Sequence, residues 1–301
     1  MNFYMLIGIP GSGKSTWAEQ NKAQLNFDIC SSDEMRFRLF NDVGYQGNNQ
    51  KVFQTLHNEI FKLLDNGKNI CYDCTNVSRK DRKGILTTLR SRFHDDINII
   101  GVCFITDVEI CKNRNLARDR VVPEYVIDKM LLRFELPFMN EGFDEIQFIE
   151  TDCKNKKHWL DAYDDMRDFD QKNPNHAYDL RTHCNKCQDY VLSKNSEYDI
   201  QPELSAAALF HDYGKLFTAQ WDEIKQCNHY YGHENVGAYK FLLLDIPPIL
   251  DKYKVAFYIN YHMEPYKLNR AKESTMHRYE RLFDTEWKNI LLLHEGDVYA
   301  H

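Results

Sequence analysis

The stretch FYMLIGIPGSGKST, Phe3–Thr16, constrains the fold more than any other part of this chain. It begins with an apolar run, Phe3–Ile9, that is typical of a buried strand. The glycine-rich turn that follows fits the pattern G-x-x-x-x-G-K-[ST], and the next residues, Lys14–Gln24, have helical character. A strand, a glycine-rich turn and a helix in this order predict the first βα unit of a parallel sheet.

The remainder of the first half repeats this alternation of short apolar runs and longer helical ones. Further strands are predicted at Phe27–Ser31, Asn69–Tyr72, Ile97–Ile105 and Gln147–Glu150, and further helices at Gln50–Asp65, Arg79–Phe93, Val108–Arg118 and Pro123–Phe134. Strands that alternate with helices indicate a mostly parallel sheet covered on both faces.

Beyond about residue 152 the strand pattern stops and only helical patterns remain. They cover Leu180–Lys194, Pro202–Asp212, His233–Leu244, Lys252–His262 and Arg278–Tyr299. The polar stretch Asp161–Asn175 ends in a turn-rich Asn-Pro-Asn and separates the two patterns. A chain of 301 residues is long enough for two cores. We therefore expect an α/β domain at 1–152, a linker at 153–167 and an all-α domain at 168–301.

Composition limits the partners and the compartment. The net charge of −7 argues against nucleic-acid binding over the whole surface, although Arg79–Arg92 and Lys112–Arg120 are locally basic. No run of about 18 apolar residues occurs, so no membrane partner is expected. Nine cysteines without a secretion signal favour free thiols and a cytoplasmic location.

The glycine-rich turn has the chemistry of a phosphate-binding loop. Its glycines allow backbone N–H groups to surround phosphate oxygens at the positive end of a helix. Lys14 can reach the β- and γ-phosphates, and Ser15 can bind Mg²⁺. The predicted nucleotide-binding residues of the loop are Gly8, Gly11, Ser12, Gly13, Lys14, Ser15 and Thr16. The expected cofactors are ATP, or another nucleoside triphosphate, and Mg²⁺.

Two charged residues follow the second predicted strand. Ligands of open α/β sheets bind beyond the carboxyl ends of the strands, so Asp33 would face the acceptor of a phosphoryl group and could accept its proton. Arg36 could hold a phosphate already present on that acceptor. The alternative interpretation makes Asp33 a helix cap and Arg36 a surface residue.

Two further features favour phosphoryl transfer. Asp73 ends the third predicted strand, where a carboxylate that organises Mg²⁺ is expected. Arg114 and Arg118 lie four residues apart on a predicted helix, hence on one face, as a lid over the transferred group requires. Surface solubility is the alternative role for these arginines.

The segments GIPGSGKST, SSDEMR, DCTNVSRKDR and CKNRNLARDR, in this order, resemble phage-type and bacterial polynucleotide 5′-kinases over about residues 1–150. The resemblance implies an α/β P-loop kinase fold. It also implies that Asp33 is the general base, that Arg36 contacts the phosphate 3′ of the acceptor nucleoside, and that Arg118, with Arg114, is a lid arginine.

The second half is rich in spaced metal-ligand residues. Imidazole and carboxylate together suit a divalent first-row metal such as Mn, Fe, Co, Ni or Zn. The segments NPNHAYDLRTH, AALFHDYGK, YYGHENVGA, INYH and EGDVYAH resemble the HD phosphohydrolase superfamily over about residues 168–301. The resemblance assigns four residues to one core metal site: His183, His211, Asp212 and Asp297. It implies that two further histidines, His233 and His262, support a second metal. It also implies that Lys215 binds a phosphate.

Alternatives remain open at this point. Single histidines are most often packed or exposed, and His176, His229, His277, His294 and His301 fit that description. The pairs Cys71–Cys74 and Cys184–Cys187 could form a zinc site only across the domain boundary, and chance spacing is the simpler explanation.

A 5′-kinase joined to a phosphoesterase is the arrangement of an enzyme that heals broken nucleic-acid ends. We expect both activities in one chain, with RNA ends favoured over DNA ends as partners and an RNA ligase as a further candidate partner. One rival is a nucleoside or small-metabolite kinase fused to an HD nucleotide hydrolase. Two others are a nucleotide sensor that switches an HD effector and a degenerate helical module that binds partners.

Overall fold

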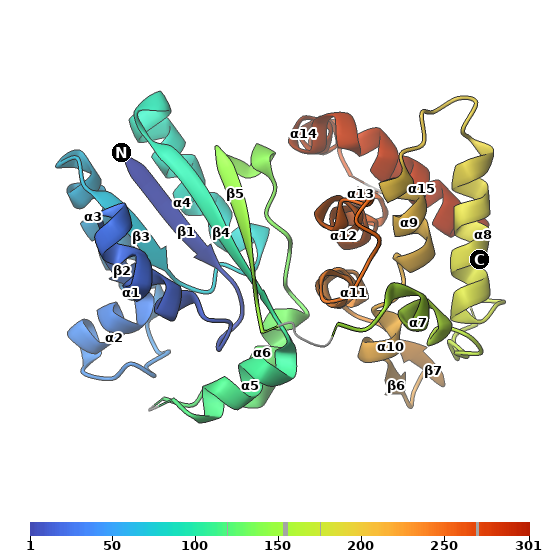
Figure 1. Cartoon of the computed structure of the whole chain (residues 1–301), viewed down its shortest axis with the longest axis horizontal. Helices are drawn as coiled ribbons and strands as arrows, with labels where there is room; N and C mark the ends of the chain where they lie inside the picture. The colour runs from blue at the N-terminus through green and yellow to red at the C-terminus, as the bar shows by residue number, and fades with distance from the viewer. Residues whose placement is uncertain (119, 153–155, 175, 269–270) are drawn as a thin grey trace. The chain divides into compact units, whose positions relative to one another are not determined.

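The computed structural model describes residues 1–118, 120–152, 156–174, 176–268 and 271–301. The chain divides into two compact units (Figure 1). Unit 1 contains Met1–Met130 and Pro137–Cys153, and unit 2 contains Leu131–Leu136 and Lys154–His301. Among the described residues, no helix has both the length and the apolar composition needed to cross a bilayer.

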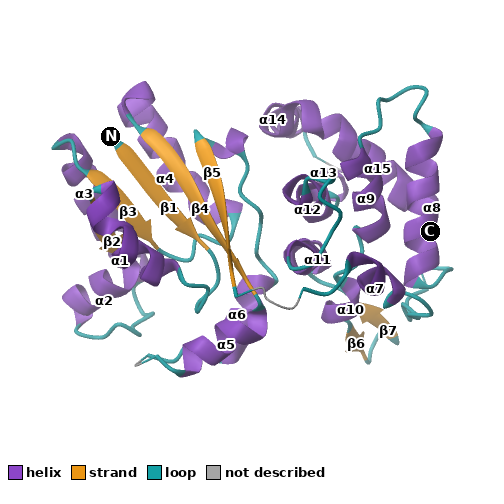
Figure 2. Ribbon diagram, in the orientation of Figure 1, coloured by secondary structure: helices purple, strands orange, loops and turns teal. Residues whose placement is uncertain are grey.

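Unit 1 is built on a five-stranded sheet in the order β2-β3-β1-β4-β5, in which every neighbouring pair is parallel (Figure 2). Its strands are β1 (Asn2–Ile7), β2 (Phe27–Ser31), β3 (Asn69–Asp73), β4 (Asn98–Thr106) and β5 (Glu145–Thr151). The central strands β1 and β4 are buried along nearly their whole length, as expected for a sheet covered on both faces. The predicted α/β architecture with a parallel sheet is therefore confirmed.

The helices of unit 1 are α1 (Lys14–Leu25), α2 (Ser32–Phe40), α3 (Asn49–Asp65), α4 (Arg79–Phe93), α5 (Val108–Leu116) and α6 (Glu124–Leu131), and short 3₁₀ turns occur at His94–Asp96 and Met139–Glu141. Helix α2 was not anticipated from the sequence. Its N-cap is Ser31, whose hydroxyl accepts a 3.2 Å hydrogen bond from the backbone N–H of Asp33. The Asp33 side chain is therefore not the cap of this helix.

Unit 2 is mostly helical. Its helices are α7 (Trp159–Asp164), α8 (Leu180–Ser193), α9 (Pro202–Phe210), α10 (Lys215–Thr218), α11 (His233–Leu242), α12 (Lys252–Tyr261), α13 (Glu264–Leu268), α14 (Glu273–Phe283) and α15 (Trp287–Tyr299), with a 3₁₀ turn at Asp284–Glu286. Three details differ from the sequence-based expectation. Helix α7 lies within the stretch expected as a linker, and β6 (Gln220–Asp222) pairs with β7 (Cys227–His229) in an antiparallel hairpin. The single helix expected at Arg278–Tyr299 is two helices, because the chain turns at Asp284, which has a φ of 48°.

A six-residue segment, Leu131–Leu136, belongs to unit 2 although the chain on either side of it belongs to unit 1. We call this segment the strap. Phe134 is fully buried and packs edge-on against Tyr239 with ring centroids 4.8 Å apart. The Asn260 amide accepts a 2.7 Å bond from Leu136 N and donates a 3.2 Å bond to Phe134 O. Because the strap is held in this way, α6 ends at Leu131, and the predicted helical run does not continue to Phe134.

Candidate active sites

The phosphate-binding loop lies between β1 and α1, as predicted. Gly11 and Gly13 have φ values of +82° and +99°, which side-chain-bearing residues rarely adopt. A Cβ atom on Gly11 would lie 2.2 Å from the carbonyl oxygen of Cys111, so the backbone of α5 allows only glycine there. The Lys14 ammonium donates 2.8 Å bonds to the carbonyl oxygens of Gly8 and Ile9. Lys14 is buried, and this burial lowers its pKa.

An open cavity of about 1770 Å³ extends from this loop. Most residues predicted for the kinase site line it: Gly11, Gly13, Lys14, Ser15, Thr16, Asp33, Arg36, Asp73, Arg114 and Arg118. Gly8 and Ser12 support the loop from behind, since the amide of Gly8 donates to Thr75 O at 2.9 Å and Ser12 is fully buried.

The two predicted Mg²⁺-binding residues meet at the edge of the sheet. The Ser15 hydroxyl donates a 2.7 Å hydrogen bond to Oδ2 of Asp73, which ends β3 beside the central strand β1. Burial raises the pKa of Asp73, while Lys14 and the Ser15 hydroxyl oppose that rise. A hydroxyl and a carboxylate beside a lysine fit the oxygen-ligand preference of Mg²⁺.

Asp33 and Arg36 lie on one face of α2. Arg36 Nη1 donates a 3.0 Å bond to Oδ1 of Asp33, and Nη2 donates a 3.1 Å bond to the Asn49 side chain. The Arg36 guanidinium also lies 5.8 Å from the centroid of the Phe53 ring. Arg36 is nearly buried, so it is not the surface residue of the alternative interpretation.

Three arginines approach the cavity from α5 and the loop after it. Arg114 forms an ion pair with Asp152 and donates a 3.4 Å bond to the carbonyl oxygen of Gly11. Arg118 lines the cavity. Arg120, which is not one of the predicted lid arginines, donates a 2.8 Å bond to Oδ1 of Asp33. Its only sequence signal is membership of the basic run Lys112–Arg120.

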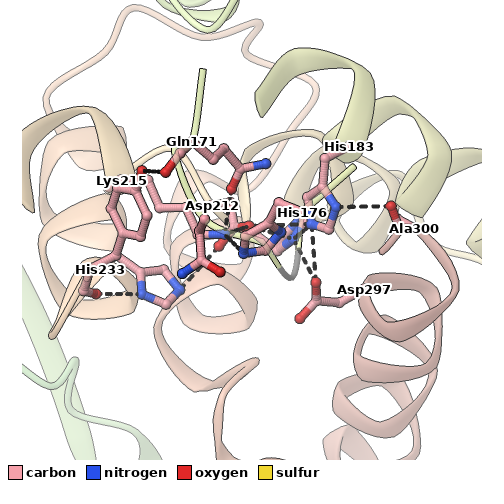
Figure 3. A network of polar contacts seen from close by, with 12 residues as sticks. Gln171, His176, His183, Asp212, Lys215, His233, Asp297 and Ala300 are labelled. Carbon is pink, nitrogen blue, oxygen red and sulfur yellow. Dashed lines mark hydrogen bonds and ion pairs between the residues drawn. The ribbon is translucent and has the colours of Figure 1, made fainter. Parts of the chain in front are cut away.

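In unit 2, residues of α8, α11 and α15 form a buried cluster with residues that directly follow α9 and α12 (Figure 3). One ligand atom from each of His183, His211, Asp212 and Asp297 lies within 4.8 Å of the others. His183 Nε2 is 3.2 Å from His211 Nε2 and 3.1 Å from Oδ1 of Asp297. The four residues that the resemblance assigned to one metal site are thus brought together.

Asp212 also belongs to a second ligand set, with His233 and His262. Its Oδ2 atom lies 3.3 Å from Nε2 of His183, whereas its Oδ1 atom lies 3.0 Å from Nε2 of His233. His233 and His262 face each other with 3.3 Å between their Nε2 atoms. One carboxylate therefore connects two groups of imidazoles, an arrangement suited to two neighbouring cations.

Backbone carbonyls orient all four rings. The Nδ1 atoms of His211, His233 and His262 lie 2.9, 2.8 and 2.7 Å from the carbonyl oxygens three residues earlier in the chain. His183 Nδ1 lies 3.3 Å from the carbonyl oxygen of Ala300 (Figure 3). When Nδ1 donates its proton to a carbonyl, Nε2 presents its lone pair to the cluster, which is the usual orientation of metal-binding histidines.

The electrostatics of the cluster favour a bound cation. Burial opposes the charge on Asp212, but Lys215 and His211 hold its pKa well below the usual range. Burial alone would lower the pKa of His183, yet its hydrogen bonds to Asp212 and Asp297 raise the pKa to about 9. Burial likewise opposes the charge on Asp297, but its hydrogen bonds to His183 and His211 hold its pKa well below the usual range, so the cluster combines two charged carboxylates with imidazoles. The His and Asp donor set fits a first-row metal.

Polar side chains surround this cluster. Lys215 Nζ lies 2.6 Å from Oδ2 of Asp212 and donates a 2.8 Å bond to the Gln171 side chain. His176 and His301, which were expected to be packed or exposed, lie against the cluster instead. His176 Nε2 is 3.2 Å from Lys215 Nζ, and His301 Nε2 is 3.5 Å from Oδ1 of Asp297. The spacing of single histidines gave no signal that could have identified them.

The cysteine alternative has less support. Cys71, Cys74, Cys184 and Cys187 are all buried free thiols. The candidate metal clusters found among the described residues contain only histidine and aspartate.

The phosphate-binding loop, the parallel sheet and the cavity beyond the strand ends define unit 1 as an α/β domain of the P-loop kinase type. Residues 3–137 match the family described as an AAA domain. A curated relative, the transcription factor bHLH140 of Arabidopsis thaliana, is 28% identical over 158 residues. The match covers 50% of this chain and 16% of that protein.

Solved structures with a similar arrangement include kinases of several kinds. The Pnkp1/Rnl/Hen1 RNA repair complex is 23% identical with a TM-score of 0.38, over 43% of this chain and 42% of that one. A gluconokinase from Sinorhizobium meliloti 1021 is 14% identical with a TM-score of 0.36, over 50% and 83% of the two chains. A fungal RNA kinase is 15% identical with a TM-score of 0.33, over 49% and 73%.

Proposed function

We propose that this chain is a bifunctional enzyme that heals nucleic-acid ends, with RNA ends as its favoured substrates. Unit 1 would phosphorylate a 5′-hydroxyl with ATP, and unit 2 would hydrolyse a 2′,3′-cyclic phosphate or a 3′-phosphate. The observation that carries the proposal is the presence of two sites in one chain. One is the P-loop cavity, which is lined by Asp33, and the other is the buried cluster of two ligand sets that have Asp212 in common.

In the kinase reaction, the oxygen of the 5′-hydroxyl would form a bond to the γ-phosphorus of ATP. The bond from that phosphorus to the β,γ-bridging oxygen would break, and its electron pair would leave with ADP. Asp33 would orient the hydroxyl and accept its proton. Lys14, Arg114 and Arg118 would stabilise negative charge on the phosphates. Ser15 and Asp73 would hold Mg²⁺, which neutralises the phosphate charge when bound.

In the hydrolase reaction, the oxygen of water would form a bond to phosphorus, and one phosphorus–oxygen ester bond would break. The ribose oxygen would leave and take up the proton that the water loses. Divalent metal held by the two ligand sets that share Asp212 would lower the pKa of water and polarise a phosphoryl oxygen. Lys215 lies at the cluster and would bind the phosphate, releasing Asp212 to the metal.

The two chemistries complement each other at a single strand break. Many ribonucleases leave a 5′-hydroxyl and a 2′,3′-cyclic phosphate, whereas a ligase usually requires a 5′-phosphate and a 3′-hydroxyl. Hydrolysis of the cyclic phosphate and then of the resulting monoester would leave a 3′-hydroxyl. One chain would then repair both ends of a break, and an RNA ligase would be a natural partner.

The proposal is tested with one short RNA that has a 5′-hydroxyl and a 2′,3′-cyclic phosphate. The RNA is incubated with the protein, ATP and Mg²⁺, with Mn²⁺, Co²⁺ or Ni²⁺ added in parallel, and both ends are read by mass spectrometry. A new 5′-phosphate together with an altered 3′ end is expected. A new 5′-phosphate alone would limit the proposal to the kinase. No change at either end would overturn it in favour of a kinase for small metabolites.

A further inference from the structure

Two arginines from different elements converge on one oxygen of Asp33. Arg36 Nη1, from α2, donates at 3.0 Å, and Arg120 Nη1, from the loop after α5, donates at 2.8 Å. Within the described part of the chain, both bonds fall on Oδ1. Two guanidinium groups and one carboxylate leave a net positive charge at this point of the cavity. The nearly buried Arg36 also has an Nε atom that finds no partner among the described residues.

The loop that carries Arg120 is held in place from within unit 1. Asn115 is almost fully buried, and its side chain donates a 2.8 Å bond to Val122 O and accepts a 3.0 Å bond from Val122 N. This pair of bonds closes the loop between α5 and α6 and places Arg120 opposite α2. Arg36 is fixed by Asn49 and Phe53, whereas the side chain of Arg120 is 30% exposed. Of the two, Arg120 is free to change its partner.

We propose that Arg120 is a specificity residue that exchanges Asp33 for a phosphate of the acceptor strand. The inference rests on the proposed kinase function and concerns the same cavity. In the free protein, Arg120 restrains the Asp33 carboxylate. A bound strand offers a phosphate near Arg36, and the guanidinium of Arg120 transfers to it because phosphate oxygens accept bidentate bonds from arginine. Asp33, then held by Arg36 alone, can turn toward the 5′-hydroxyl.

The same exchange would limit wasteful hydrolysis of ATP. Without an acceptor, water could attack the γ-phosphorus, lose its proton to Asp33 and yield ADP and inorganic phosphate. While Arg120 holds the carboxylate, Asp33 is poorly placed to accept that proton. A strand with a phosphate removes the restraint, whereas water does not. The cavity would thereby select a phosphate-bearing acceptor over solvent.

The test compares the full-length wild type with R120A and R120K. R38A is the matched control, because Arg38 shares α2 with Asp33 and Arg36 but pairs with Glu59 outside the cavity. Three quantities are measured: the KM for a 5′-hydroxyl RNA, the KM for ATP, and the rate of ADP release without RNA. R120A is expected to raise the KM for RNA roughly tenfold or more, as the loss of a charged hydrogen bond does, and to leave the KM for ATP unchanged. It should also speed ADP release without RNA, with R120K intermediate and R38A like the wild type.

An unchanged KM for RNA in R120A would overturn the inference. An equal rise in the KM for RNA and the KM for ATP would also overturn it and would place Arg120 at the nucleotide. A wild type that phosphorylates no RNA would refute the proposed function instead. In that case ADP release still decides the role of Arg120. Faster release by R120A than by R38A supports the restraint on Asp33, and equal release refutes it.

Discussion

The Ser15 hydroxyl donates a 2.7 Å hydrogen bond to Oδ2 of Asp73, although 58 positions separate the two residues in the sequence. The contact exists because β1 and β3 are adjacent parallel strands, so the residues that follow β1 meet the end of β3. The pair lies beside Lys14 in the P-loop cavity. From this position we expect the pair to bind Mg²⁺, so that substitution of Asp73 changes how the phosphorylation rate depends on the Mg²⁺ concentration.

Asp73→Asn should slow 5′ phosphorylation on the order of 100-fold or more, because a neutral amide binds Mg²⁺ poorly. Bound Mg²⁺ lowers the free energy of the charged transition state by several kcal/mol. Added Mg²⁺ should recover part of the rate. The measurement is the phosphorylation rate of a 5′-hydroxyl RNA at increasing Mg²⁺ concentrations. Hydrolysis at the 3′ end is the internal control, and a rate independent of this substitution would exclude Asp73 from metal binding.

The two activities should be separable by mutation. Asp33→Ala should reduce 5′ phosphorylation by about 10²–10⁴, the usual contribution of a general base, and leave 3′-end hydrolysis intact. Lys14→Ala should do the same, and Asp212→Ala should have the reverse effect. Both reactions are assayed on one RNA, with circular dichroism as a check of folding. Loss of both activities in a folded variant would contradict the model of two independent sites.

Metal content should reveal the bridging position of Asp212. His262→Ala removes a ligand of the second set alone and should lower the number of metal ions bound per chain while leaving some metal in place. Asp212→Ala should remove metal from both sets, since its two oxygens face different histidines. His277→Ala is the matched control, because this histidine is exposed and pairs with Glu280 outside the cluster. Elemental analysis of the purified proteins decides, and equal losses in the first two variants would refute a shared ligand.

Gly11→Ala should destabilise the protein and weaken ATP binding. The positive φ alone costs about 1–3 kcal/mol, and the clash with the Cys111 carbonyl adds to this. Gly84→Ala is a matched control, for which we expect a change in stability of the opposite sign. Gly84 lies within α4 with open space around it, so alanine should stabilise the helix by about 1 kcal/mol. Thermal unfolding of the two variants measures both effects.

Local sequence patterns predicted most of unit 1 because the phosphate loop and the buried strands are encoded by neighbouring residues. Gly11, Lys14 and Ser15 could be placed from one motif. Contacts set by tertiary structure could not be read in this way. Arg120 appeared only as part of a basic run, and its pairing with Asp33 depends on the loop closed by Asn115. The roles assigned to the site residues from resemblance stay predictions that the experiments above address.

In unit 2 as well, features encoded by short motifs could be predicted, whereas features fixed by tertiary contacts could not. The ligand motifs around His183, Asp212 and Asp297 predicted a cluster that the fold brings together. The break at Asp284 and the hairpin formed by β6 and β7 were missed, because short turns carry weak periodicity. The end of α6 was missed because packing against Tyr239 and Asn260, rather than local propensity, fixes the chain after Leu131.

Phe134→Ala should destabilise unit 2 by about 3–5 kcal/mol, because it empties a fully buried aromatic site within the strap. Phe37→Ala removes the same side chain from a position that is 53% exposed and should have little effect. Unfolding by urea, followed by circular dichroism, measures the midpoint for each variant. Equal midpoints for the two variants would show that the strap contributes nothing to this unit.

The strap makes the chain pass from one unit to the other three times, so neither unit is a single continuous stretch of the sequence. A single protease cut near residue 153 would not free them, because the N-terminal product would still carry Leu131, Phe134 and Leu136 embedded in the core of the other unit. Dividing the gene at that point would likewise separate Phe134 from Tyr239 and Asn260, its neighbours in unit 2. Exchange of either unit as an independent piece of sequence would therefore require the strap to be exchanged with unit 2.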